Sequence, residues 1–348
     1  MSASKLPAVP PSQRSEAWER WSAAAPRLRP RLRDSAYLDV AALELGGSRD
    51  ACGLAQRALG PGVHLTLVID EPDVMVDVTE AMLTTWGKTI DQAVARAQAN
   101  LLARSAEPFV SLAPGVWVGP WDDAYAASRA TLPDLLSPLT SAAVVAVPDR
   151  DTLLVADGCS DQALDALVSC VGDLWGRSPY PITPQLFRCD EACWSPLTLP
   201  GDHPATARIQ ELGVEARRRG YAHQQGPLQR QVGAERYVAS AEPCRSRDGR
   251  QQLRALWTEG VDTLLPAVDR VHLLQDTGED GISSRVWVVS WETLRAQPGA
   301  LEPTSLHLPR WRTGRFPEVA QLRRIAVPAE RDPHTAAPLG QSAAYDLG

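Results

Sequence analysis

The sequence predicts an α+β fold in which an antiparallel sheet built from β-hairpins is packed by helices, in two domains. First, runs that alternate apolar and polar residues recur in pairs joined by tight turns, as in segment 63–78. Such short turns connect antiparallel strands, because parallel strands need long crossovers. Second, amphipathic helical stretches follow these hairpins. Third, 348 residues exceed one typical domain, and the proline-rich segment 196–204 suggests a boundary.

Residues 1–36 are predicted to be a basic, proline-rich arm. Residues 1–33 carry a net charge of +5. A short helix over 12–25 would place Trp18 and Trp21 on one face, and Pro26 and Pro30 would end it. The arm is either an electrostatic docking element or a solvated linker, and its composition favours the linker.

The next segment, 37–205, is predicted to be the first α+β domain. A strand over 63–70 returns over 74–78 as a hairpin. Thr79 is expected to cap a helix that ends at Gly87, and Thr89 a second helix. The remaining elements are apolar runs at 108–112 and 116–118, a helix from Asp122 to about Leu136, a hairpin at 143–147 and 152–156, and a helix capped by Ser160.

Residues 206–327 are predicted to form a mixed α+β carboxy-terminal domain. It begins with a helix over 205–220, continues with strands, and closes with a helix over 291–297. The expected strands cover 236–240, 253–257, 270–274 and 285–290. The low-complexity tail, 328–348, is expected to be disordered.

Composition and charge limit the classes of function. No stretch approaches the roughly 20 apolar residues of a membrane helix, the amino terminus lacks a signal-peptide core, and six cysteines are widely spread. We therefore expect a cytoplasmic protein with no membrane partner. Two lysines against 33 arginines, with abundant proline and alanine, indicate a GC-rich bacterial genome.

The charge is distributed unevenly along the chain. Residues 34–205 carry nine basic and 23 acidic side chains, a net charge of −14. This charge repels phosphate backbones, so we expect no nucleic-acid partner. It suits a basic protein or a cation, although a solvated acidic surface is the simpler interpretation.

Five segments within about 63–200 resemble, in order, a bacterial family. They are LTLVIDEPDVMVDVTEAML, TTWGKTIDQAVARAQANLL, WDDAYAASRATLPDLL, VVAVPDRDTLLVAD and YPITPQLFRC. This order is similar to the YtpQ-like family, domain-of-unknown-function family 1444. The resemblance implies that 37–205 is a YtpQ-like module of bacterial origin. It implies no reaction, because that family has no established activity.

The most distinctive polar motif is Asp149-Arg150-Asp151, predicted at a hairpin tip behind Pro148. Asp149 and Asp151 are candidate catalytic carboxylates that would orient an anion held by the Arg150 fork. Alternatively, the aspartates accept turn amides and Arg150 pairs with a neighbouring acid.

Four more residues are candidates for binding a ligand or partner. Ser128 and Arg129 could form a second anchor, or an internal ion pair or helix surface. Trp117 and Trp121 bracket Gly119-Pro120 in a chain with eleven tryptophans and three phenylalanines. Exposed tryptophans would mark a contact surface, whereas core filling is their usual role.

Metal and cofactor sites receive little support from the sequence. Asp70, Glu71, Asp73 and Asp77 could attract a divalent cation, but neighbouring strand residues point apart. Cys189, Cys193, His203 and Cys244 do not form the two close pairs of a zinc site. Nucleophile-elbow, phosphate-loop and dinucleotide motifs are missing. We expect no metal and no cofactor.

The sequence therefore favours a non-catalytic protein-binding or accessory module, in one version an immunity-like antagonist of a basic protein. The alternative is a metal-assisted or phosphate-handling hydrolase that uses the 149–151 tip. Convergence of Asp70, Asp77, Asp149 and Asp151 in one concave site would favour the enzyme. The oligomeric state is left open.

Overall fold

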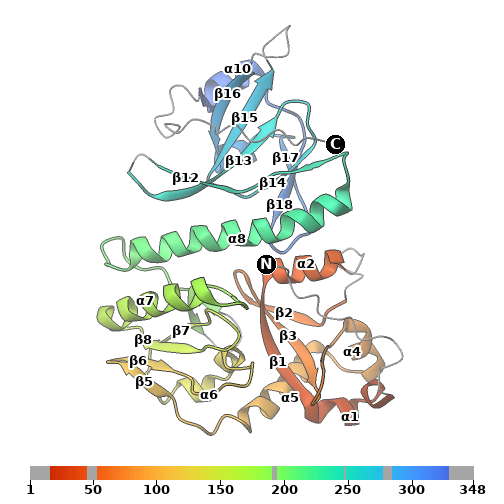
Figure 1. Ribbon diagram of the computed structural model, residues 1–348, viewed down its shortest axis with the longest axis vertical. Coiled ribbons are helices and arrows are strands. Elements are labelled where there is room, and N and C mark those ends of the chain that lie inside the picture. Colours follow the sequence, from red (N-terminus) through yellow and green to blue (C-terminus); the bar gives the residue numbers. More distant parts are fainter. Residues whose placement is uncertain (1–15, 45–52, 190–193, 247, 277–283, 329–348) are drawn as a thin grey trace. The chain divides into compact units, whose positions relative to one another are not determined.

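The computed structural model describes residues 16–44, 53–189, 194–246, 248–276 and 284–328. These residues form an α+β fold, with helices packed on several largely antiparallel sheets (Figure 1). The chain divides into two compact units. Unit 1 comprises residues 1–35 and 50–209, and unit 2 comprises residues 36–49 and 210–348.

A four-stranded antiparallel sheet begins unit 1. Its order is β1-β3-β2, and β4 also pairs with β3. The predicted hairpin is confirmed, because Val68–Asp70 pair with Met75–Asp77. The strands are β1 (Leu28–Asp34), β2 (Gln56–Gly60), β3 (Val63–Asp70) and β4 (Met75–Asp77).

The predicted arm differs from the structure from Leu28 onward. The segment expected to be a solvated linker is β1, which pairs with β3 from Leu28↔Ile69 to Asp34↔Val63. Leu28 and Leu32 are buried in the core, and the arginines alternate with them. Pro30 fits this strand because β1 is at the sheet edge, where a missing N–H can be tolerated.

Short helical turns precede β1: η2 (Glu16–Glu19), α1 (Trp21–Ala24) and η3 (Ala25–Arg27). Trp18 is buried and Trp21 packs against the same core, as their spacing predicts. Residues 1–15, the rest of the predicted arm, lie outside the described residues.

The predicted caps of the next two helices are confirmed. The Thr79 side chain accepts a hydrogen bond from Met82 N at the start of α4 (Glu80–Trp86). Thr89 and Gln92 form a reciprocal capping box at the start of α5 (Ile90–Leu102). Gly87 ends α4 with φ 61°, a left-handed conformation that glycine adopts without a side-chain clash.

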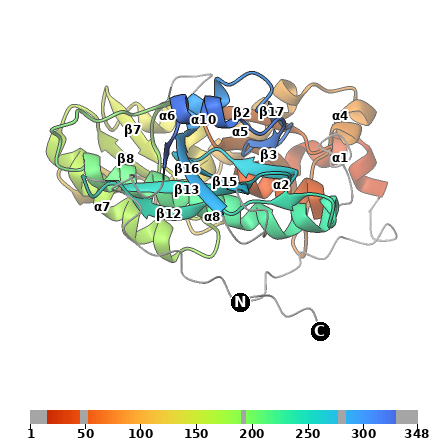
Figure 2. The same ribbon diagram turned by 90° about the horizontal axis from the view of Figure 1, so that it is seen from above.

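A six-stranded antiparallel sheet completes unit 1, in the order β10-β9-β7-β8-β6-β5. Helix α7 (Asp161–Arg177), capped by Ser160 as predicted, packs on it, and Figures 1 and 2 both show α7 beside β8. The strands are β5 (Val110–Ala113), β6 (Val116–Val118), β7 (Ala143–Ala146), β8 (Leu154–Asp157), β9 (Leu186–Cys189) and β10 (Trp194–Pro196).

The continuous helix predicted from Asp122 to Leu136 is wrong. The chain forms a loop, then η4 (Ala127–Thr131) and α6 (Pro133–Leu136). The Asp123 side chain accepts a hydrogen bond from Tyr125 N and so stabilises a turn in place of a helix. Pro133 has no N–H for an intrahelical bond, and it lies at the start of α6, where none is needed.

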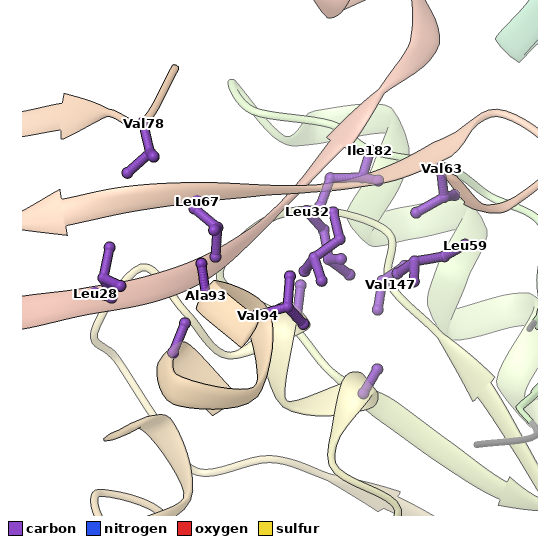
Figure 3. Close-up of a cluster of buried hydrophobic side chains, with 14 of the residues drawn as sticks. Leu28, Leu32, Leu59, Val63, Leu67, Val78, Ala93, Val94, Val147 and Ile182 are labelled. Carbon is purple, nitrogen blue, oxygen red and sulfur yellow. The ribbon is translucent and has the colours of Figure 1, made fainter. Parts of the chain in front are cut away.

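The main core of unit 1 lies between its sheets and α5. Figure 3 shows Leu28 and Leu32 of β1 and Leu67 of β3 beside Ala93 and Val94 of α5. Val147 and Ile182, from the loops of the six-stranded sheet, belong to the same cluster. The two sheets therefore share one apolar interior.

Unit 2 contains α9 (Trp291–Arg295), α10 (Val319–Ile325) and all but the first residues of α2 (Ser35–Glu44) and α8 (Thr206–Val232). One sheet has the order β11-β14-β18-β17, and the other β12-β13-β15-β16-β19. The strands are β11 (Tyr237–Val238), β12 (Glu242–Arg245), β13 (Gln251–Thr258), β14 (Thr263–Pro266), β15 (Arg270–Asp276), β16 (Ser284–Ser290), β17 (Leu301–Pro303), β18 (Arg310–Thr313) and β19 (Val327–Pro328).

Two details of unit 2 differ from the sequence prediction. The pairs β11/β14 and β13/β15 are parallel. Helix α8 continues to Val232, beyond its predicted end at Gly220. Gly220 is a packing position, since a Cβ there would lie 2.8 Å from Leu308 Cδ2. The predicted tail begins at β19, and residues 329–348 lie outside the described residues.

A buried polar network joins residues 36–44, the described part of segment 36–49, to the rest of unit 2. Asp39 accepts hydrogen bonds from His307 N, Leu308 N and the Gln224 amide. The side-chain oxygen of Gln224 accepts a hydrogen bond from Nε of the fully buried Arg310. The Nη1 and Nη2 atoms of Arg310 donate hydrogen bonds to backbone carbonyls. Burial lowers the pKa of Arg310 to about 10.

No helix formed by the described residues is both long enough and apolar enough to span a membrane.

Candidate functional site

Two of the predicted binding segments adjoin one another. The 149–151 tip lies between β7 and β8, and the carbonyl of Arg150 accepts a hydrogen bond from Ala127 N at 3.2 Å. Ala127 begins η4, which carries Ser128 and Arg129. The tip is therefore packed against η4 along one of its edges.

Each member of the tip has a local partner. Asp149 is buried, and its Oδ1 accepts a hydrogen bond from Asp151 N at 3.0 Å. The Arg150 guanidinium lies 3.6 Å from the centroid of the Tyr180 ring, and its Nε contacts the Asp151 carboxylate at 3.2 Å. These contacts match the alternative interpretation, in which an aspartate accepts a turn amide and Arg150 pairs with a neighbouring acid.

Arg129 is a fully buried cation. Its Nη1 and Nη2 donate to the two carboxylate oxygens of Asp123 at 2.9 and 2.7 Å, and its Nε donates to Ser105 Oγ at 2.7 Å. Burial raises the pKa of Asp123, but the hydrogen bonds and charge of Arg129 outweigh burial and hold that pKa below its usual value. Arg129 thus forms an internal ion pair, and the neighbouring Ser128 is buried as well.

The two candidate tryptophans contribute to the interior. Trp121 is buried, and its ring lies 4.4 Å from the Arg129 guanidinium and 5.2 Å from the Phe109 ring. Trp117 of β6 is half-buried, opposite Ser111 of β5. Trp121 therefore contacts Phe109, the residue before β5, and Trp117 pairs with Ser111 within β5.

The candidate carboxylates occupy different sheets. Asp70 and Asp77 belong to β3 and β4, whereas Asp149 and Asp151 follow β7. Within the described part of the chain, no group of three or more His, Cys, Asp or Glu side chains could hold a metal ion. Of the zinc candidates, Cys193 lies outside that part. The convergence expected of an enzyme is not found among the described residues.

The exposed apolar feature of this region is β5, the last strand of the six-stranded sheet. Val110 and Leu112 are each 50% exposed. Its sequence, VSLA, contains no charge and no proline, the devices that normally protect an edge strand. The sequence marks 108–112 as an apolar run, but only the pairing order shows that it lies at an edge.

Exposed acidic side chains flank β5 in the sequence and occur on α7, which packs on the same sheet. Glu107 and Asp122 are exposed on either side of β5 in the sequence. The exposed positions of α7 include Asp161, Asp165 and Asp173. In contrast, Arg29, Arg31 and Arg129 of unit 1 are buried, so part of its positive charge lies inside. Arg104, Arg177 and Arg188 are exposed, but the exposed acidic side chains named above outnumber them.

Searches of protein-family models, curated proteins and solved structures found no match to this chain.

Proposed function

We propose that the protein is a non-catalytic binding or accessory module of the bacterial cytoplasm that engages a basic protein partner at β5. The observation that supports this proposal is the edge strand with half-exposed Val110 and Leu112. The YtpQ-like character of residues about 63–200 is part of the same proposal, which includes neither a nucleic-acid nor a membrane partner.

Strand addition is the binding mode that suits β5. An edge strand presents backbone N–H and C=O groups, which an extended peptide can pair with, and alternate side chains give specificity. Fully burying a Val or Leu side chain stabilises by about 1.5–3 kcal/mol, so covering two half-exposed ones contributes roughly 1 kcal/mol each. Backbone pairing and shape must supply the rest of the affinity.

The acidic surroundings would act mainly on the rate of association. A complementary charge steers encounter and disfavours acidic competitors, while contributing less to the final affinity. A basic toxin-like protein held by such a surface would give the immunity-like version of this function. In that version the acidic module accelerates capture and β5 retains the target.

The test starts with affinity capture from the native cell extract and continues with the purified captured protein. The double variant Val110→Ser/Leu112→Ser removes the apolar surface without adding charge, and should weaken binding about 30-fold, since roughly 2 kcal/mol is lost. Leu174→Ser on α7 is the matched control, because Leu174 is 38% exposed in the same unit. Higher ionic strength should slow association of the wild type.

Equal dissociation constants for the wild type and the double variant, measured by surface plasmon resonance, would contradict the proposal. So would a captured partner that is acidic.

A further inference from the structure

A second cluster of charged residues lies on the four-stranded sheet of unit 1. Pairing places Arg29 of β1 opposite Val68 of β3, on the face that carries Asp70 and not on the face of Leu28 and Ile69. Val68 packs with the buried Tyr125, which follows Asp123 in the loop after β6. The cluster thus lies on a different sheet from β5 and the 149–151 tip, although Tyr125 is two residues from Ala127, whose N–H donates a hydrogen bond to the tip.

Asp70 lies between two guanidinium groups without bonding closely to either. Its Oδ2 is 4.0 Å from Arg29 Nε and 3.9 Å from Arg104 Nη1. Both separations exceed hydrogen-bond distance. The Asp70 side chain is 26% exposed and that of Arg104 is 54% exposed, so solvent reaches both. Asp70 is therefore held by the two arginines only at long range, and the Tyr125 hydroxyl is its third neighbour.

Two buried donors in the cluster lack ordinary hydrogen-bond partners among the described residues. Arg29 is 9% exposed, with Nη1 held by the carbonyls of Pro26 and Leu28, but its Nε has no acceptor. The Tyr125 hydroxyl is buried and has no acceptor within ordinary hydrogen-bond geometry. Its neighbour is the Asp70 carboxylate, and burial together with that charge raises the pKa of Tyr125. A buried donor without a partner is costly, and an incoming acceptor would remove that cost.

The charges leave an excess of positive charge here. Asp123 pairs with Arg129 and also attracts Arg29 and Arg104. The latter two both lie near Asp70, so three guanidinium groups face two carboxylates. Burial, and then the charge of Arg104, lower the pKa of Arg29. An anion between the two guanidinium groups would relieve this repulsion.

The backbone beside the cluster is strained. Ala124 has φ 62°, and it is the non-glycine residue with positive φ among the described residues. Such a conformation is unfavourable for a residue with a Cβ and occurs preferentially at functional sites. Asp123 maintains it by accepting from Tyr125 N while paired with Arg129. The hydrogen bond to Asp123 therefore holds the backbone of Tyr125 in place.

We propose that Arg29, Arg104 and Tyr125 form a binding site for a tetrahedral oxyanion, the phosphate group of a small molecule. Arg29 and Arg104 supply the charged donors, and the Tyr125 hydroxyl supplies a neutral one. Asp70 occupies the site in its absence and is displaced when the oxyanion binds. Arginine forks match phosphate geometry closely, and hydrogen bonds to charged groups are among the stronger ones.

The test is isothermal titration calorimetry of the full chain with inorganic phosphate, with sulfate and acetate as further arms. Arg104→Gln should weaken phosphate binding at least about tenfold, because a charged hydrogen bond is lost. Asp70→Asn should strengthen it, because the competing charge is removed. Exposed Arg177 of α7 provides the matched control Arg177→Gln, which should bind like the wild type.

Three results would overturn this site: no phosphate binding by the wild type, equal binding by Arg104→Gln, or weaker binding by Asp70→Asn in a protein with an unchanged melting temperature. Tyr125→Phe gives an independent check, because it removes only a hydroxyl and should weaken phosphate severalfold. Stronger binding of acetate than phosphate would assign the site to carboxylates and refute the tetrahedral ligand.

Discussion

Replacing Arg129 with alanine tests whether this residue stabilises the fold of unit 1. The variant removes a bidentate pair with Asp123, the Nε bond to Ser105 and the stacking on Trp121. Removing one partner of a buried ion pair costs about 3–5 kcal/mol, because the other charge is stranded. Water reaches the 26%-exposed Asp123, so the lower limit, about 3 kcal/mol, is expected.

That loss corresponds to a fall in melting temperature of roughly 6–12 °C for a domain of this size. Urea denaturation followed by tryptophan fluorescence measures the free energy of unfolding. Arg150→Ala is the matched control. Its side chain is 26% exposed and it pairs with the adjacent Asp151, so it should lose about 1 kcal/mol at most.

The effect of Arg129→Ala should depend on pH with a definite sign. The pKa of Asp123 in the folded protein is below its ordinary value. The stabilisation from its pair with Arg129 is therefore fully present above about pH 4, and is lost as the pH falls through the folded pKa. The difference between wild type and variant should shrink in strong acid. A variant as stable as the control at neutral pH, or a difference that grows in acid, would refute this reasoning.

Three further predictions concern packing, the buried network and the thiols. Gly60→Ala should destabilise by about 1–3 kcal/mol, because its Cβ would lie 2.8 Å from the carbonyl oxygen of Trp194; a thermal melt measures this change. Gln224→Leu should cost about 2–4 kcal/mol, since Asp39 and Arg310 each lose a buried hydrogen bond, and an unchanged urea midpoint would contradict that role. Thiol titration of the unfolded, unreduced chain should find all six cysteines reduced; two or fewer would contradict a cytoplasmic location.

The elements that could be predicted from sequence are those determined by neighbouring residues. The hairpin at 63–78 follows from strict alternation, and the helix starts at Thr79, Thr89 and Ser160 follow from side chains that accept amides three residues away. These interactions do not depend on distant parts of the chain.

The elements that could not be predicted depend on distant pairing. Strand β1 has a period of two, but its arginines and proline resemble a solvated linker until β3 is placed beside it. The loop at 122–126 depends on Arg129 holding Asp123. The edge position of β5 and the meeting of Arg29 with Asp70 and Tyr125 likewise depend on the order of strands, which local composition does not encode.

The hydrogen bond between His307 N and Asp39 joins residues 268 positions apart, and so constrains the order of events during translation. At about 5–20 residues per second, the ribosome needs roughly 13–54 s to proceed from one to the other. Residues 50–209 emerge meanwhile and can fold. Residues 36–44 cannot yet form their hydrogen bonds with His307 and Leu308, because these have not been synthesised. Leu38 and Val40, buried in the finished protein, are accessible to chaperones over that interval. A nascent chain stalled before residue 307 should therefore contain a protease-resistant unit 1 and a protease-sensitive segment at 36–44.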